Sequence, residues 1–150
     1  MTDDILKTGE VLVQPTRRGR FQQLLSTNEH AIVADEPEAV GGLGAGLSPY
    51  DLLLASFGAC TAMTLRLYAG RKALPLEDVH VRLVHGRVHA TDCQKPEEAT
   101  SKVDAIDREI SLIGPLSEEQ RLKLMEIADK CPVHRTLSAG VLIRTTLKPA

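Results

Sequence analysis

The longest apolar stretch of the chain runs from Leu52 to Leu65 and carries no charged side chain. Ser48 before it is a good N-cap, Pro49 suits the first helical position, and Asp51 supplies the acid of a capping box. The pattern predicts a helix that begins at Ser48 and ends near Gly70. A helix without a polar face must be covered nearly all round. We expect a core helix, because this stretch is shorter than the ~20 apolar residues of a membrane span.

Short alternating and β-branched runs on either side of this helix predict β-strands. Three strands precede the helix, two follow it as a hairpin, and one closes the chain: Val11–Val13, Phe21–Leu25, Ala31–Ala34, Val79–Ala90, Val103–Ile113 and Val141–Leu147. The alternation in the hairpin predicts an inward face made of apolar side chains. These are Val79, Val81 and Leu83 on the first strand and Ile106, Ile110 and Leu112 on the second.

Two further helix starts follow the hairpin. Ser117 and Gln120 form a capping box before an apolar run at helical spacing that continues to about Lys130. Cys131 directly before Pro132 is another helix-start arrangement. Strands in runs, rather than in strict alternation with helices, indicate an α+β fold with an antiparallel sheet packed on helices. We expect one domain over residues 1–150, because no linker or internal repeat is visible.

The composition narrows the possible functions. With 43% hydrophobic, 25% charged and 3% aromatic residues, the chain has the composition of a globular protein with an aliphatic core. A formal net charge of -2 with interspersed signs favours neither nucleic acid nor an anionic membrane as a partner. The opening segment MTDDILKTGE does not resemble a secretory signal, so we expect a cytoplasmic protein. Three cysteines without a CxxC motif indicate reactive or inert thiols rather than structural disulfides.

The cysteines occupy contrasting places in the predicted elements. Cys60 lies in mid-helix among uncharged neighbours, so a reactive thiolate there needs a cation from a distant segment or another subunit. A buried free cysteine also commonly acts only as a small hydrophobe. Cys131 at a helix start meets unpaired backbone amides and the positive end of a dipole, which favours thiolate. Cys93 lies in an acidic loop with only Lys95 nearby, and we expect it to be a bystander.

Other kinds of site fit the sequence less well. His85, His89, Cys93 and His134 offer metal-binding side chains, but the two histidines four apart on a strand are too distant for joint ligation. Cys60 with His134 could form a nucleophile and base pair for acyl transfer, yet no oxyanion motif accompanies them. The glycines of residues 35–46 lack the GxxxxGK[ST] pattern of a phosphate-binding loop. We therefore expect no metal, nucleotide or other bound cofactor.

Two long motifs resemble one known family. The run SPYDLLLASFGACTAMTLRLYA and the later segment CPVHRTL look like the OsmC and organic hydroperoxide resistance family, in particular its OsmC-like branch. The resemblance covers essentially the whole chain. It implies an OsmC-like fold in which antiparallel sheets wrap two central helices of an intertwined homodimer. A partner subunit would then cover the faces of the apolar helix that one chain leaves open.

The resemblance also implies a thiol peroxidase that reduces organic hydroperoxides. In that reading Cys60 attacks the peroxide and becomes a sulfenic acid, Cys131 resolves it to a disulfide, and a lipoyl-type dithiol regenerates the pair. In the family an arginine of the N-terminal strands, paired with an acid, holds the peroxidatic thiolate. Arg17, Arg18 and Arg20 are the candidates here, and we choose Arg20 because GRFQQ best matches the strand entry.

One departure from the family pattern bears on this site. The hydroperoxide-resistance branch has a glutamate directly after the helix-starting proline, whereas this chain has Tyr50 there and Asp51 next. Asp51 either replaces that glutamate or only caps the helix. We expect Tyr50, Leu53, Phe57 and Met63 to bind substrate, which favours alkyl or lipid hydroperoxides. The alternative is a non-enzymatic member that binds a small apolar ligand or senses redox state in the dimer cleft.

Overall fold

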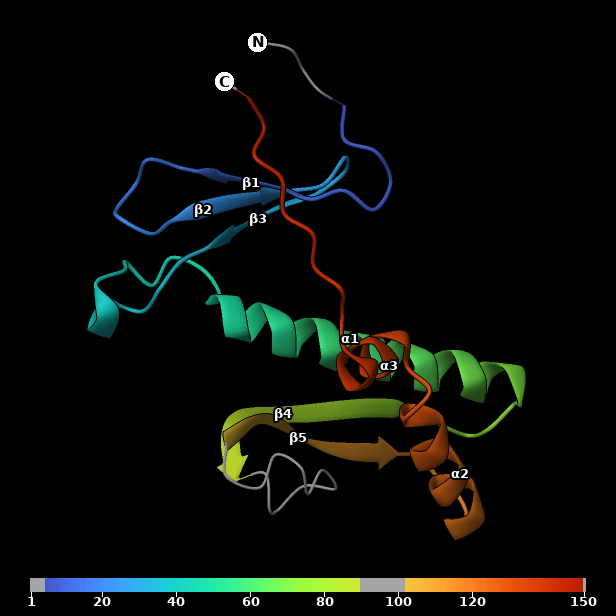
Figure 1. Cartoon of the computed structure of the whole chain (residues 1–150). Helices are drawn as coiled ribbons and strands as arrows, with labels where there is room; N and C mark the ends of the chain where they lie inside the picture. Colours follow the sequence, from blue (N-terminus) through green and yellow to red (C-terminus); the bar gives the residue numbers. More distant parts are fainter. Residues whose placement is uncertain (1–4, 90–101, 150) are drawn as a thin grey trace. The chain divides into compact units, whose positions relative to one another are not determined.

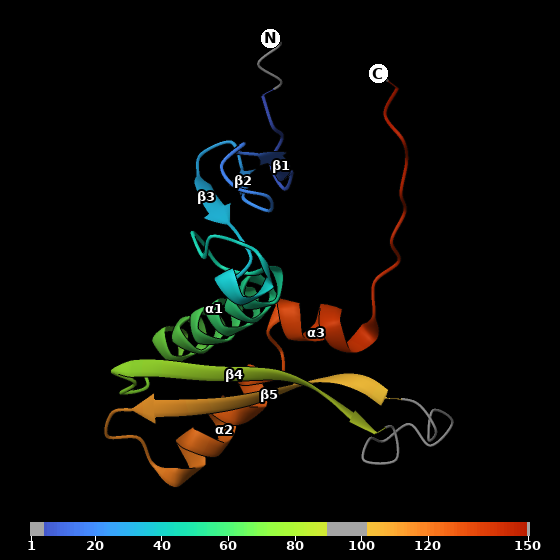
Figure 2. The same cartoon turned by 90° about the vertical axis from the view of Figure 1, so that its left-hand side faces the viewer.

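The chain, seen in a computed structural model, is described over residues 5–89 and 102–149 and forms two compact units, residues 1–53 and 54–150. Figures 1 and 2 show its elements in the order β1, β2, β3, η1, α1, β4, β5, α2 and α3. Helix α1 begins in the first unit and continues in the second. Cys93 lies outside the described residues, and the single domain expected over 1–150 stays a prediction.

The first unit holds a three-stranded antiparallel sheet in the order β1-β2-β3. Its elements are β1 (Leu12–Pro15), β2 (Gln23–Ser26) and β3 (Ala31–Ala34), followed by the short 3-10 helix η1 (Glu38–Val40). The three strands predicted here are confirmed, with the bounds of the first two shifted toward the C-terminus. The basic corner between β1 and β2 is a tight turn, because Arg17 has a left-handed φ of 65° and Gly19 one of 69°.

Asp35 organises the loop that leads from β3 to α1. Its side chain is buried, and its carboxylate accepts hydrogen bonds from the backbone amides of Glu36 at 2.8 Å, Leu43 at 3.1 Å and Ala45 at 3.2 Å. Burial opposes ionisation of Asp35, but these bonds and one from Gln22 outweigh it and lower the pKa of the carboxyl group. The glycine-rich loop is therefore folded around a charged internal anchor.

Helix α1 (Pro49–Arg71) has the predicted start. The Ser48 amide donates to Asp51 Oδ2 at 3.1 Å and the Asp51 amide donates to Ser48 Oγ at 3.3 Å, which confirms the capping box. The helix has 23 residues and a mean hydropathy of 1.4 in its most apolar window, so it is long and apolar enough to cross a membrane. The expectation that it is too short to do so is wrong. Core helices of soluble proteins pass the same test.

One face of α1 is covered by its own chain. The buried residues recur at helical spacing and form a single stripe: Phe57, Gly58, Thr61, Leu65 and Ala69. A second stripe, which we call the exposed α1 stripe, consists of Ala55, Ala59, Met63 and Leu67. The expectation of a helix covered nearly all round is therefore not met within one chain. The reason is that the hairpin and α2 supply covering side chains to one side only.

The hairpin predicted after α1 is confirmed. Strand β4 (Asp78–His89) pairs antiparallel with β5 (Lys102–Ile113), with Val81 opposite Ile110 and Leu83 opposite Arg108. Figures 1 and 2 both show α1 running alongside this hairpin. The inward face is the predicted one, since its apolar side chains are half-buried while their strand neighbours, apart from the half-buried Ala105, are exposed.

Helix α2 (Glu118–Ala128) closes the core of the second unit. Its predicted capping box between Ser117 and Gln120 is present, and Asp129 is its C-cap. The core joins α1, α2 and the inward face of the hairpin. Its buried members are Leu65, Ala69, Leu116, Leu124, Ile127 and Ala128, with Val79, Ile110 and Leu112 packed against them. The core is aliphatic, as the composition predicted.

Helix α3 (Pro132–Ala139) begins as predicted, with Cys131 as N-cap and Pro132 at the first position. The strand predicted at Val141–Leu147 is wrong for this chain, because residues 141–149 form neither strand nor helix. The side chains of this segment are exposed, and no described segment pairs with it. A strand needs a neighbour for its backbone hydrogen bonds, which alternation of side chains cannot supply. The class is nevertheless the predicted α+β with antiparallel sheets.

Candidate active site

Two cysteines that are distant in the sequence meet in the second unit. Cys60 is half-buried in the middle of α1, and Cys131 is completely buried at the start of α3. Each thiol shifts the pKa of the other, and the backbone amide of Val133 lowers the pKa of both. Each thiol therefore feels the ionisation of the other, and the N-terminal turn of α3 serves both.

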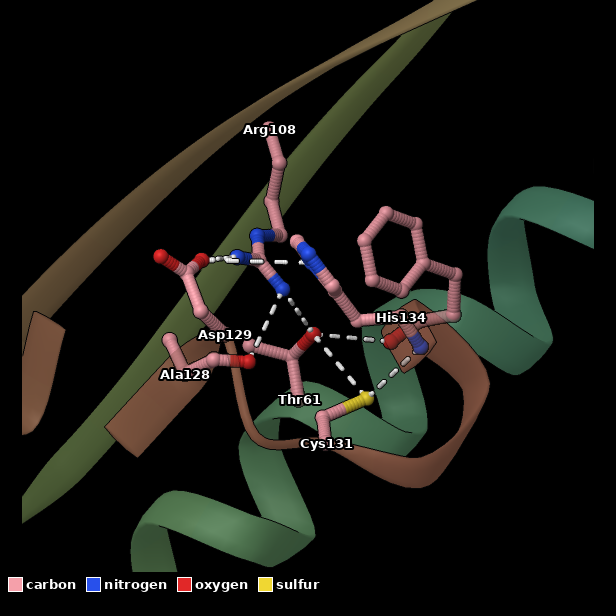
Figure 3. Close-up of polar contacts among 7 residues, drawn as sticks. Thr61, Arg108, Ala128, Asp129, Cys131 and His134 are labelled. Atoms are coloured by element: carbon pink, nitrogen blue, oxygen red, sulfur yellow. Dashed lines mark hydrogen bonds and ion pairs between the residues drawn. The ribbon is translucent and has the colours of Figure 1, made fainter. Parts of the chain in front are cut away.

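Cys131 is the thiol whose surroundings favour the negative charge. Its Sγ accepts a hydrogen bond from the His134 backbone amide at 3.4 Å and lies 4.0 Å from the Thr61 hydroxyl (Figure 3). Burial opposes ionisation, but the hydrogen bonds from Cys60, His134, Thr61 and Val133 outweigh it and lower the pKa of Cys131. This direction agrees with the prediction made from its place at a helix start.

Cys60 has the opposite tendency. Burial raises the pKa of its thiol and the neighbouring Cys131 raises it further, and together they outweigh the lowering by hydrogen bonds with the Val133 backbone amide and with Thr64. A mid-helix thiol without a cation was expected to behave in this way. The described surroundings of Cys60 in the second unit therefore favour its protonated form.

Arg108 is the functional candidate that our reading of the sequence missed. It projects from the inward face of β5, and its Nη1 donates to Thr61 Oγ1 at 3.0 Å and to the Ala128 carbonyl at 3.3 Å (Figure 3). Its Nη2 pairs with Asp129 Oδ1 at 2.8 Å. The signal was present in the sequence, because Arg108 occupies the alternating inward position between Ile106 and Ile110. A cation on an otherwise apolar strand face indicates a polar partner inside.

Phe57 and His134 complete the surroundings of this arginine. The guanidinium of Arg108 lies 4.8 Å above the centre of the Phe57 ring, and the His134 ring meets Phe57 edge-on at 5.8 Å. His134 Nδ1 is buried and 3.9 Å from Asp129 Oδ1, and it has no hydrogen-bond partner within the described part of the chain. The ring of His134 thus lies near Phe57 and Asp129, which both contact Arg108, and we call these four residues the arginine cluster.

Four predicted site residues belong to the first unit. Arg20 lies at the exposed basic corner with its guanidinium 5.0 Å above the Phe21 ring. Asp51 uses its carboxylate to cap α1, and the hydrogen bonds with Ser48 lower its pKa. Tyr50 is exposed and Leu53 is half-buried. Their predicted roles toward the cysteines stay predictions.

The other two predicted substrate contacts lie on different sides of α1. Phe57 is buried beneath Arg108, whereas Met63 is 69% exposed and belongs to the exposed α1 stripe. Within one chain, therefore, these two side chains do not line the same pocket, and a pocket that contains both needs residues of a partner subunit. Their role in substrate binding stays a prediction.

Only some of the candidate metal ligands lie in the part of the chain that the structure describes. Among residues 5–89 and 102–149, no three His, Cys, Asp or Glu side chains are grouped to hold a metal ion. His85 is hydrogen-bonded to Asp104 at 2.8 Å. Cys93 and the side chain of His89 lie outside the described part, so the expectation of no metal stays a prediction.

Comparison with known proteins places this arrangement in a family. The family model for OsmC-like proteins matches residues 42–146. No curated protein sequence gives a significant match. Among solved structures, an OsmC-like protein from Mycoplasma pneumoniae is 19% identical, with a TM-score of 0.67 and 88% of each chain covered.

Two further structures carry a name that bears on function. The organic hydroperoxide resistance protein OsmC from Legionella pneumophila is 18% identical, with a TM-score of 0.59 over 86% of this chain and 89% of that one. An organic hydroperoxide resistance protein from Elizabethkingia anophelis is 17% identical, with a TM-score of 0.60 over 88% and 89%. Such distant likeness establishes a shared fold, and the family match spans most of the sequence. The chain belongs to the family of OsmC-like proteins.

Proposed function

We propose that this chain is a thiol-dependent peroxidase that reduces organic hydroperoxides, with Cys60 as the peroxidatic cysteine and Cys131 as the resolving cysteine. The observation that carries the proposal is that Cys60 in mid-helix α1 and Cys131 at the start of α3 lie near enough for each thiol to shift the pKa of the other. Two free thiols that influence each other in this way are suited to forming a disulfide during turnover. The names of the similar Legionella and Elizabethkingia proteins support hydroperoxides as the substrate class.

The reaction has two steps within the protein. The Cys60 thiolate attacks the terminal peroxide oxygen, so that an S–O bond forms, the O–O bond breaks, and the alkoxide takes a proton to leave as an alcohol. The Cys131 thiolate then attacks the sulfenic sulfur of Cys60, which forms the disulfide and releases hydroxide that is protonated to water. The lowered pKa of Cys131 suits this second step. An external dithiol of the lipoyl type reduces the disulfide by exchange.

The first step needs help for Cys60, because the pKa of its thiol is raised. We assign this help to Arg20 of the basic corner, from its own chain or a partner, with Asp51 as the acidic residue that orients it. Tyr50, Leu53, Phe57 and Met63 are the proposed substrate contacts. An exposed arginine can move toward a thiolate, whereas the Asp51 carboxylate must serve the helix cap at the same time.

The exposed α1 stripe supports a homodimer. Its members Ala55, Ala59, Met63 and Leu67 present small and apolar side chains at intervals of four, which allows another helix to approach closely. We propose that a second copy of the chain covers this stripe and that separation of the copies accompanies unfolding. Light scattering at low micromolar concentration tests this, and a folded monomer there would contradict it.

The test of the activity is a stoichiometric one. One equivalent of tert-butyl hydroperoxide, followed by peptide mapping, should link Cys60 to Cys131 and leave Cys93 as a free thiol. Cys60→Ser should abolish peroxide consumption. Cys131→Ser should still consume about one equivalent and stop as a sulfenic acid that dimedone traps and further peroxide over-oxidises. Arg20→Ala should slow the first step without unfolding the protein.

A different pattern would favour the non-enzymatic alternative. If Cys60 stays a free thiol while Cys93 oxidises, or if Cys131→Ser behaves like the parent protein, the peroxidase assignment fails. The engagement of Asp51 in the helix cap is the observation that keeps this alternative in view. In that case a small apolar ligand bound in the dimer cleft, or redox sensing there, becomes the function to test.

A further inference from the structure

The hydroxyl of Thr61 lies between the guanidinium of Arg108 and the sulfur of Cys131. Its side chain is completely buried in the middle of α1. Its Oγ1 accepts a hydrogen bond from Arg108 at 3.0 Å and lies 2.9 Å from the Phe57 carbonyl and 4.0 Å from Cys131 Sγ (Figure 3). A hydroxyl has only one proton to donate, so the carbonyl and the sulfur compete for it.

The charge on Cys131 decides that competition. The Phe57 carbonyl is a neutral acceptor that lies within the helix, where it also serves the backbone ladder. A thiolate is a charged acceptor, and hydrogen bonds to charged groups are roughly twice as strong as neutral ones. When Cys131 ionises, the hydroxyl of Thr61 therefore turns toward the sulfur. Because Arg108 fills the acceptor side of the same hydroxyl, the turn does not leave the guanidinium without its partner.

Arg108 is held firmly enough to act in this way. Its side chain is only 10% exposed, and it is fixed by Asp129, the Ala128 carbonyl and the Phe57 ring. Asp129 is 66% exposed, so water screens its negative charge more than the buried positive charge of Arg108. The side of the guanidinium that faces Thr61 thus presents a cation to a water-poor interior.

We propose that Arg108 and Thr61 are positioning residues that act in series, the arginine through the threonine hydroxyl, to hold the sulfur of Cys131 as a thiolate ready to resolve Cys60. The catalytic use of that thiolate rests on the proposed peroxidase function. The titratable and charged groups around Cys131 are Cys60 on α1 and His134 on α3, with Arg108 on β5 in contact with Thr61 and Asp129 at the end of α2 near the His134 ring. The lowered pKa of Cys131 is consistent with this arrangement.

A thiolate titration without peroxide tests the proposal. Since the chain has three cysteines, Cys60→Ser with Cys93→Ser leaves Cys131 as the only thiol. The ultraviolet absorbance of its thiolate is followed against pH, with a variant lacking all three cysteines subtracted. In this background Thr61→Val should raise the titration midpoint by about one pH unit, the size of one hydrogen bond to a charge. Thr61→Ser keeps the hydroxyl and should keep the midpoint.

The arginine is tested in the same background. Arg108→Met should raise the midpoint by no more than Thr61→Val does, and adding Arg108→Met to Thr61→Val should cause little further change, because the arginine acts through the hydroxyl. Arg108→Lys should restore part of the shift. His134→Gln shows how much of any midpoint change comes from protonation of that imidazole instead.

Several outcomes would overturn the proposal. Folding is checked by far-ultraviolet circular dichroism for every variant, so the serine and lysine variants remain informative if Thr61→Val or Arg108→Met unfolds. Equal midpoints for the valine, serine and parent proteins would refute the role of Thr61, as would a midpoint that Arg108→Lys and Arg108→Met leave unchanged. If these shifts occur but neither the parent protein nor any variant that retains Cys60 consumes peroxide, the proposed peroxidase function fails. The stabilisation of the Cys131 thiolate by Thr61 and Arg108 is then still supported.

Discussion

Leu124 offers the sharpest test of the core that positions the arginine cluster. It is completely buried in α2 and belongs to the cluster that joins this helix to Leu65 of α1. Leu124→Ala removes buried methyl groups and leaves a cavity between two helices and the hairpin. Replacements of this kind at fully buried leucines cost about 2.7 to 5.0 kcal/mol. We expect about 3 to 4 kcal/mol, because the packed elements on all sides limit collapse of the cavity.

Leu122 provides the matched control. It lies two residues away on the same helix and is 62% exposed, so Leu122→Ala has the same effect on helix propensity but removes little buried surface. A fully buried leucine side chain contributes about 2 kcal/mol, of which about two-fifths is covered here, so the cost is about 0.8 kcal/mol. The difference between the two variants isolates burial at Leu124.

The assay is urea unfolding followed by far-ultraviolet circular dichroism, at one fixed protomer concentration because a dimer gains apparent stability with concentration. Leu124→Ala should lower the unfolding midpoint without changing the slope of free energy against urea. A loss below about 1 kcal/mol for Leu124→Ala, or equal losses for the two variants, would refute the packing of α2 against α1 and the hairpin.

Three further predictions concern the loop, a turn and the substrate. The folded-state pKa of Asp35 lies below the ordinary value of 3.8, so the stability that its carboxylate contributes is present above that value and is lost as pH falls through the folded pKa. In urea unfolding measured at several pH values, Asp35→Asn should be less stable than the parent at neutral pH. Its unfolding free energy should also change less with pH in acid. Gly114 has a φ of 135° and an added Cβ would overlap the Pro75 carbonyl, so Gly114→Ala should cost roughly 1 to 3 kcal/mol in the same melts, whereas Gly86→Ala, with open space around it, should cost far less. In a dithiol-coupled assay, cumene or tert-butyl hydroperoxide should turn over faster than hydrogen peroxide, since each buried CH₂ contributes about 0.8 kcal/mol, and equal turnover would argue against an apolar pocket.

The amino-acid sequence by itself determined the features that depend on residues a few positions apart. The capping pairs Ser48 with Asp51 and Ser117 with Gln120 could be predicted because an N-cap and its partner are three residues apart in any helix. The same holds for Cys131, whose place before a proline predicted both a helix start and a lowered pKa. The inward face of the hairpin followed from alternation alone.

Only the tertiary structure decided which of these elements meet. Thr61 and Arg108 are 47 residues apart, and Thr61 and Cys131 are 70 apart, so no local spacing rule relates them. The strand predicted at Val141–Leu147 was wrong for a related reason. Alternation of side chains describes the faces of a strand but does not provide a neighbouring strand for its backbone to pair with. Arg108 became a candidate once Thr61, Asp129 and the Ala128 carbonyl were seen around it. A buried charge is tolerated only where such partners converge, and their convergence is a property of the packed fold.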